Sequence, residues 1–106
     1  MVNAKEELLK WVNGNHLRNK TPKTIKWARI YRFAQDSEDD NDYIELRPDH
    51  TEEEYKTFLE CLNFWYDDGY GMQEVGGTVM FTDNTWLYRY EYDGAECWRM
   101  ASVPEF

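Results

Sequence analysis

Carboxylates are the groups of this chain whose number and spacing come closest to a known chemistry. The chain has 21 Asp and Glu among 106 residues, and the run Asp36–Asp42 sets several of them at alternate positions, as a calcium loop does. An EF-hand loop starting at Asp36 needs glycine and glutamate where this chain has Asn41 and Arg47. The run therefore predicts a solvated loop that holds no metal and presents its acidic side chains to a partner. The candidate partner-binding residues in it are Asp36, Glu38, Asp39, Asp40 and Asp42.

Cysteine and histidine are too few and too widely spaced for a catalytic or zinc site. His16 falls in a polar connection and His50 precedes a helix, while Cys61 and Cys97 stand among apolar residues. The two cysteines are predicted to be reduced and buried, with a single disulfide as the alternative. No glycine-rich phosphate loop is present. We expect no enzymatic activity, no cofactor and no bound metal.

Charge is segregated along the chain. Residues 1–34 carry eight Lys or Arg against two Glu, a balance of +6. Residues 35–106 carry four Lys or Arg against nineteen Asp or Glu, a balance of −15, so the net charge is −9. Such a polarity creates a field that orients an oppositely charged partner. We expect a protein partner with a basic surface, for example a site that otherwise holds nucleic acid.

Length and composition set the class of protein. A chain of 106 residues predicts one domain, and a hydrophobic fraction of 42% with 17% aromatic residues predicts a packed core rather than disorder. The sequence has no apolar run long enough for a membrane span and no signal-peptide core at its start. The prediction is a cytoplasmic protein without membrane contact.

Local patterns predict a single α+β domain of element order α-β-β-α-β-β-β, with two helices on an antiparallel sheet of about five strands. Asn3 and Thr51 are each followed three residues later by Glu, which is a capping box that opens a helix. Asp83-Asn84 and Asp93-Gly94 are the predicted turns between the last strands. The predicted helices are Ala4–Val12 and Thr51–Tyr66, and the predicted strands are Thr24–Ala34, Tyr43–Arg47, Thr78–Thr82, Thr85–Tyr92 and Ala95–Ser102.

Two-residue loops at both of these turns would fix which side chains share a face of the sheet. The first face is then strongly aromatic and is expected to pack on the second helix. Its members are Val79, Phe81, Trp86, Tyr88, Tyr90, Tyr92, Cys97 and Ala101. The second face carries an apolar group that is either covered by the first helix or exposed as an interaction patch. This group is Met80, Leu87, Trp98 and Met100.

Glu91 and Glu96 fall opposite each other in this register, and a like-charge pair costs stability. If both side chains extend into water beside Arg89, replacing Glu96 by lysine is expected to be neutral or stabilising. The functional alternative is an acidic rim around Trp98 that meets a cationic partner. The candidate partner-binding residues of this hairpin are Glu91, Asp93, Glu96 and Trp98.

A nucleic-acid-binding module is the alternative from another class. Cations surround Trp27 and Tyr31, a mixture that is typical of single-strand binders. They are Arg18, Lys20, Lys23, Lys26, Arg29 and Arg32. The acidic remainder of the chain repels phosphate, and the basic segment can instead neutralise neighbouring acidic strands. We therefore expect no binding to DNA or RNA near physiological salt.

The stretch WLYRYEYDGAECW at Trp86–Trp98, followed by Pro104, resembles a hairpin of small uncharacterised bacteriophage proteins. The resemblance implies a non-enzymatic accessory protein or inhibitor that acts on a host protein. Together with the charge, it predicts an acidic protein that binds the basic site of a partner, in the manner of a nucleic-acid mimic. A bacterial immunity or antitoxin protein would share the acidic interface and is a further alternative.

Overall fold

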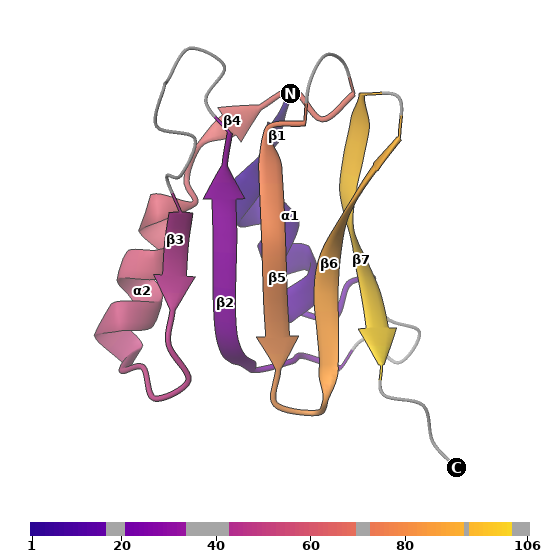
Figure 1. The fold of residues 1–106 in the computed structure, drawn as a ribbon. Coiled ribbons are helices and arrows are strands. Elements are labelled where there is room, and N and C mark those ends of the chain that lie inside the picture. Colours follow the sequence, from indigo (N-terminus) through magenta and orange to yellow (C-terminus); the bar gives the residue numbers. More distant parts are fainter. Residues whose placement is uncertain (17–20, 34–42, 70–72, 93, 103–106) are drawn as a thin grey trace.

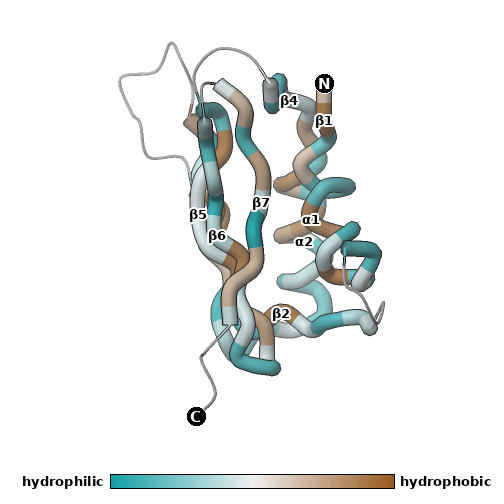
Figure 2. The backbone as a smooth tube through the Cα atoms, turned by 90° about the vertical axis from the view of Figure 1, so that its right-hand side faces the viewer, coloured by the Kyte–Doolittle hydropathy of each residue, from teal (hydrophilic) through white to brown (hydrophobic). Residues whose placement is uncertain are grey.

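The fold is a five-stranded antiparallel sheet with both helices on one of its faces (Figures 1 and 2). The computed structural model describes residues 1–16, 21–33, 43–69, 73–92 and 94–102. The strand order is β3-β2-β5-β6-β7, and β1 and β4 form a separate two-stranded sheet. The predicted α+β class is confirmed. The elements are β1 (Val2–Asn3), α1 (Ala4–Val12), β2 (Ile25–Arg32), β3 (Tyr43–Leu46), α2 (Glu52–Cys61), β4 (Trp65–Tyr66), β5 (Val75–Phe81), β6 (Thr85–Tyr92) and β7 (Ala95–Ser102).

Both helices begin at the predicted caps. The Asn3 side chain accepts a hydrogen bond from the Glu6 amide at 3.1 Å, and Thr51 forms a complete capping box with Glu54. Each cap satisfies an amide that has no partner inside the helix. The bounds of α1 agree with the prediction, and three glutamates in the first turn of α2 suit the helix dipole.

Helix α2 is shorter than predicted. Its regular spacing of apolar residues continues to Tyr66, but the helix ends at Cys61, and Trp65–Tyr66 pairs with Val2–Asn3 as β4. The Ala4 amide also donates to the Phe64 carbonyl at 2.9 Å. These contacts with the start of the chain, together with the burial of Tyr66, outweigh the local helical pattern.

The turn between β5 and β6 contains three residues rather than two. Thr82, Asp83 and Asn84 connect the strands, and Asn84 has φ = 67°, the conformation that closes a three-residue hairpin loop. Val79 therefore pairs with Leu87, one residue away from the predicted register. Because a shift of one residue exchanges the two faces of a strand, the predicted assignment of faces is wrong for β6 and β7, whereas Val79 and Phe81 of β5 are buried as predicted.

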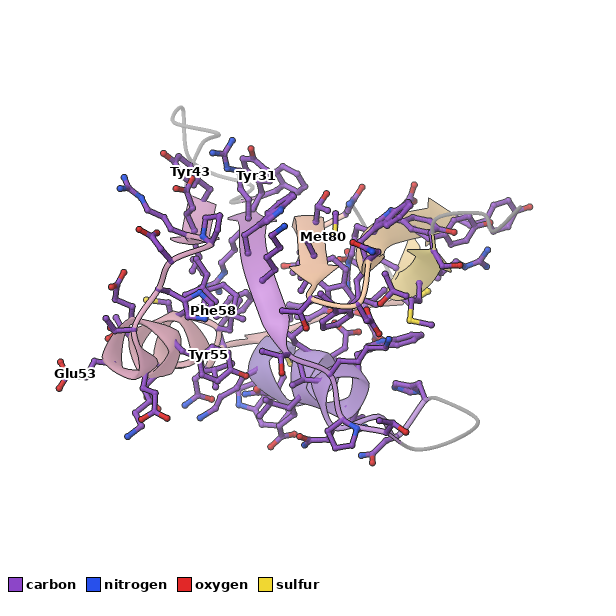
Figure 3. The ribbon with its side chains drawn as sticks, turned by 90° about the horizontal axis from the view of Figure 1, so that it is seen from below. Tyr31, Tyr43, Glu53, Tyr55, Phe58 and Met80 are labelled. Atoms are coloured by element: carbon purple, nitrogen blue, oxygen red, sulfur yellow. The ribbon has the colours of Figure 1, made fainter. Side chains whose placement is uncertain are left out.

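The observed register turns Leu87 and Trp98 toward the helices and the tyrosines of β6 away from them. Of the apolar group that was predicted to be either covered by a helix or exposed, Leu87 and Trp98 are buried and Met100 is partly buried. Met80 lies on the opposite face (Figure 3). The predicted register of the second hairpin is confirmed by the pair between Tyr92 and Ala95. We call the face toward the helices the inner face and the opposite one the outer face.

The core lies between the inner face and the helices, and Phe58 points into it from α2 (Figure 3). Phe58 and Leu62 are 2% and 1% exposed. We expect Phe58→Ala and Leu62→Ala each to lower the free energy of unfolding by about 2–5 kcal/mol, because both leave a cavity. Urea denaturation followed by tryptophan fluorescence measures the loss. The control is Thr57→Ala at an exposed position of the same helix, and a similar small change in all three variants would contradict this packing.

Candidate binding surface

Glu96 lies in a buried ionic cluster and not at a solvated rim. The Arg89 guanidinium donates to the Glu96 carboxylate at 2.7 and 3.2 Å, to Glu7 of α1 at 3.0 Å, and to the Tyr66 hydroxyl, which itself donates to Glu7. The Arg89 and Glu96 side chains are 2% and 0% exposed. The expectation that Glu96 extends into water is therefore wrong, although its predicted neighbour Arg89 is correct.

Backbone amides and aromatic rings complete this Arg89 cluster. Glu96 accepts from the amides of Glu74 and Val75 at 2.7 and 3.0 Å, so its carboxylate has several donors. The Arg89 guanidinium lies 4.9 Å from the ring centroid of Trp98, which is 4% exposed. A charged pair without water is stable only when it is this fully hydrogen-bonded. Glu96 and Trp98 thus support the hairpin from inside.

The cluster shifts the pKa values of its members. Burial disfavours the charged form of Arg89, but the Glu7 carboxylate and the hydrogen bond to Glu96 outweigh it and raise the guanidinium pKa above its ordinary value. Burial, aided by the hydrogen bond to Glu7, raises the pKa of the Tyr66 hydroxyl well above its ordinary value. Both groups stay protonated at neutral pH, so the cluster serves to hold α1, β4, β6 and β7 together.

The other predicted partner-binding residues divide into two groups. Glu91 is exposed, and its carboxylate accepts a hydrogen bond from the Gly94 amide at 2.9 Å. The remaining candidates lie outside the described residues, and their roles stay predictions. They are Asp36, Glu38, Asp39, Asp40, Asp42 and Asp93.

Three cations of the described part of the basic segment are paired with carboxylates or rings of the fold. Lys23 binds Asp83 and Thr85, Arg29 donates to Glu45 at 2.7 Å, and Arg32 lies 4.1 Å from the ring centroid of Phe64. Burial raises the pKa of Asp83, but hydrogen bonds from Lys23 and Thr85 outweigh it and hold the pKa below its ordinary value. The alternative in which this segment neutralises acidic neighbours therefore accounts for Lys23 and Arg29.

The outer face of the sheet carries an aromatic surface, and the aromatic residues of β6 that belong to it were predicted to pack on the second helix. Tyr31 and Tyr43 point away from the helices and lie with their ring centroids 5.9 Å apart (Figure 3). No described element covers this face (Figures 1 and 2). The signal for it was Asn84, because asparagine readily adopts positive φ and allows a three-residue loop. The outer aromatic surface consists of Trp27, Tyr31, Tyr43, Trp86, Tyr88, Tyr90 and Tyr92 of the strands, together with Phe33, whose ring stacks on that of Tyr31.

Arginines and a hollow lie within the outer aromatic surface. Arg29 lies 5.4 Å from the ring centroid of Tyr43, and Arg99 of β7 lies 3.7 Å from that of Tyr90. A hollow of about 510 Å³ opens over β2, β3 and β5, with Trp27 among its lining residues. This arrangement can bind an apolar or aromatic group, since rings and arginines are held in place by strands.

Among the described residues, no cluster of three or more His, Cys, Asp or Glu can hold a metal ion. Cys61 and Cys97 are free thiols, as predicted, but both are exposed, so their predicted burial is wrong. Within the described part of the chain, no helix is long and apolar enough to cross a membrane.

Comparison of the chain with protein families, with curated proteins and with solved structures gives no match. The interpretation of its surfaces therefore depends on their geometry and chemistry.

Proposed function

We propose that the chain is a non-enzymatic binding protein that docks a partner protein on its outer aromatic surface. The observation that carries the proposal is the composition of this uncovered face. Where one face of an antiparallel sheet meets water, its residues are ordinarily polar. Here eight aromatic side chains occupy that face, and Tyr43 and Tyr88 are 54% and 38% exposed. An apolar surface of this kind marks an interaction site.

The residue types of this face favour a protein as the partner. Tyrosine, tryptophan, arginine and methionine are enriched at the centres of protein interfaces, whereas Lys, Asp and Glu are depleted. Along the described strands, Glu45 is the one carboxylate paired across the outer face, and it is bound to Arg29. Aromatic rings fixed on strands also lose little conformational entropy on binding.

Charge favours a partner whose interface is basic around an apolar centre. The net charge is −9, and five carboxylates lie in the connection of residues 34–42, which leaves the sheet after Phe33 and returns at Tyr43. Both of these residues belong to the outer aromatic surface. Complementary charge would steer a basic partner toward this end of the surface and repel an acidic one. An inhibitor or accessory protein of phage type, as the hairpin resemblance implies, fits this description.

The test is to capture the partner from a bacterial lysate on the immobilised chain, purify it and measure its dissociation constant by calorimetry. We expect Tyr43→Ala and Tyr88→Ala each to weaken binding about tenfold or more, because exposed rings at an interface centre act as hot spots. Glu53→Ala is the matched control, since Glu53 points away from the sheet on α2 (Figure 3). Equal dissociation constants for all three variants would exclude the outer aromatic surface.

Single-stranded nucleic acid is the alternative occupant, because rings and arginines also stack on bases. The net charge and the pairing of Arg29 with Glu45 weigh against it. The distinguishing experiment measures the affinity for fluorescently labelled single-stranded DNA and RNA by fluorescence anisotropy at several salt concentrations. Tight binding that weakens steeply with salt and is lost on charge reversal at Lys23, Lys26 and Arg32 would show that the ligand is nucleic acid and not a protein.

A further inference from the structure

Strand β7 is an edge strand of the five-stranded sheet, and among the described residues only Asp68 bonds to its outward backbone groups. The Glu96 amide donates to the Asp68 carbonyl at 2.7 Å, so it points away from β6. Hydrogen bonding alternates along an antiparallel strand, and the backbone groups of Trp98, Met100 and Ser102 therefore point the same way. Within the described residues these three have no backbone partner on that side.

The two edges of the sheet differ in their protection. Strand β3 has four residues, is followed by Pro48 and carries the paired Glu45, all features that block strand addition. Strand β7 has eight residues with no proline and no register shift in its pairing with β6, and its two charged residues, the buried Glu96 and Arg99, are held by Arg89 and by the ring of Tyr90. Natural edge strands of this length are usually blocked or covered unless they pair with something.

A hollow beside this edge is lined by residues of α1 and β7. Figure 2 shows that these two elements lie next to each other. Its volume is about 370 Å³. The lining combines indole rings with more carboxylates than cations, and Asp68 both lines the hollow and caps the β7 edge. The charged and indole-bearing lining residues are Met1, Glu6, Glu7, Lys10, Trp11, Trp65, Asp68 and Trp98.

The lining of this β7 hollow suits a cationic side chain. Glu7 is committed to Arg89, so the other charged groups of the lining are the carboxylates of the exposed Glu6 and the half-buried Asp68 and the cations of Lys10 and the Met1 amino group. Trp65 is exposed and offers its ring face, and ammonium or guanidinium groups bind such faces. Carboxylates beside tryptophan repel an acidic side chain and attract lysine or arginine.

We propose that β7 and this hollow together bind an extended segment of the partner protein with lysine or arginine at alternate positions. The inference rests on the proposed function, since the segment belongs to the docked partner. The segment adds a strand to the β7 edge, so that main-chain hydrogen bonds supply affinity and alternate side chains supply specificity. Its cationic side chains point into the β7 hollow, and the side chains between them extend the outer face beside Arg99.

The probe is a fluorescein-labelled peptide, Thr-Lys-Val-Lys-Val-Lys-Thr, capped at both ends. We expect it to bind the full chain and to protect the Trp98 and Met100 amides from hydrogen exchange, measured by NMR. A peptide with Glu in place of Lys is expected not to bind. A scrambled peptide of the same composition, which keeps the charge and loses the alternation, is expected to bind at least about tenfold more weakly. Equal binding of the alternating and scrambled peptides would overturn the inference, because it would reflect net charge alone.

Variants locate the site. Met100→Pro removes an outward amide without touching the bonds to β6, and Met100→Ala is its matched control for the lost side chain. We expect the proline variant to bind the peptide about tenfold more weakly than the alanine variant. Asp68→Asn, which keeps the shape, is expected to weaken binding several-fold even if the proline variant does not fold. Unchanged affinity in Asp68→Asn, or in a folded Met100→Pro, would overturn the assignment to this edge.

The outer aromatic surface supplies the distinguishing control. Tyr88→Ala is expected to leave peptide affinity unchanged while weakening the whole partner. If the peptide fails to bind and the partner still depends on Tyr43 and Tyr88, the edge inference fails and the proposed function stands. If the peptide binds at the edge and neither Tyr43→Ala nor Tyr88→Ala weakens binding of the partner, the proposed function of the outer aromatic surface is wrong and the edge inference stands.

Discussion

Glu96→Lys is expected to lower the free energy of unfolding by about 3–5 kcal/mol, because it breaks a buried ion pair and places two cations together. The lysine would face Arg89, whose side chain is 2% exposed, and would leave the amides of Glu74 and Val75 without their acceptor. A domain of this size has a total stability of only about 5–15 kcal/mol. The loss is measured by urea denaturation with circular dichroism, or appears directly as an unfolded spectrum.

Glu91→Lys is the matched control for this change. Glu91 lies directly opposite Glu96 in the hairpin but is exposed, so the two variants make the same chemical change in different environments. The control removes the like-charge pair and one hydrogen bond to the Gly94 amide, and we expect an effect within about 1 kcal/mol. Similar small effects of both variants would mean that the Arg89 cluster does not form in solution.

The sequence predicted the opposite result for Glu96, for a definite physical reason. The hairpin register that places Glu91 against Glu96 followed from the Asp93-Gly94 turn and is confirmed. The orientation of that pair depended on the preceding hairpin, where Asn84 adds a third loop residue. Both faces of β6 and β7 carry apolar residues, so the alternating pattern alone did not decide which face is buried. The aromatic residues of β6 were assigned to the core and lie in fact on the outer face, whereas Phe81 of β5 lies in the core as predicted.

The Arg89 cluster could not be predicted from the sequence because it depends on contacts between residues that are far apart in the chain. From the sequence alone, Arg89 and Glu96 resemble surface residues. Their burial depends on Glu7 of α1 and Tyr66 of β4, which are distant in the sequence and contact Arg89 only in the folded protein. Capping motifs, by contrast, depend on neighbours three residues apart, and for this reason Asn3 and Thr51 were sufficient to place both helix starts. The same distinction applies to the outer aromatic surface. The high aromatic content was evident from the composition, but the face on which the rings lie depends on the register of β5 against β6.

Gly77→Ala is expected to destabilise the protein by about 4 kcal/mol or more, through a clash at the centre of the sheet. Gly77 has φ = +127°, which side chains rarely tolerate. A Cβ atom there would lie 2.1 Å from the Arg29 carbonyl oxygen and 2.8 Å from the Ile30 Cα. Both atoms are backbone of β2, so relief requires that β2 and β5 separate. Thermal and urea denaturation measure the effect.

Gly76→Ala separates this backbone clash from the general cost of replacing glycine in a strand. Its Cβ would lie 3.0 Å from the ring of Phe33, which is a side chain at the outer face and can rotate away. We therefore expect this variant to stay within about 1 kcal/mol of wild type, and to disturb the outer aromatic surface more than the fold. Its effect on partner binding then reports on Phe33 in a folded protein, whereas Gly77→Ala is expected to lose binding together with structure. Equal stability of the two variants would contradict the positive φ at Gly77 and with it the close contact of β5 with β2.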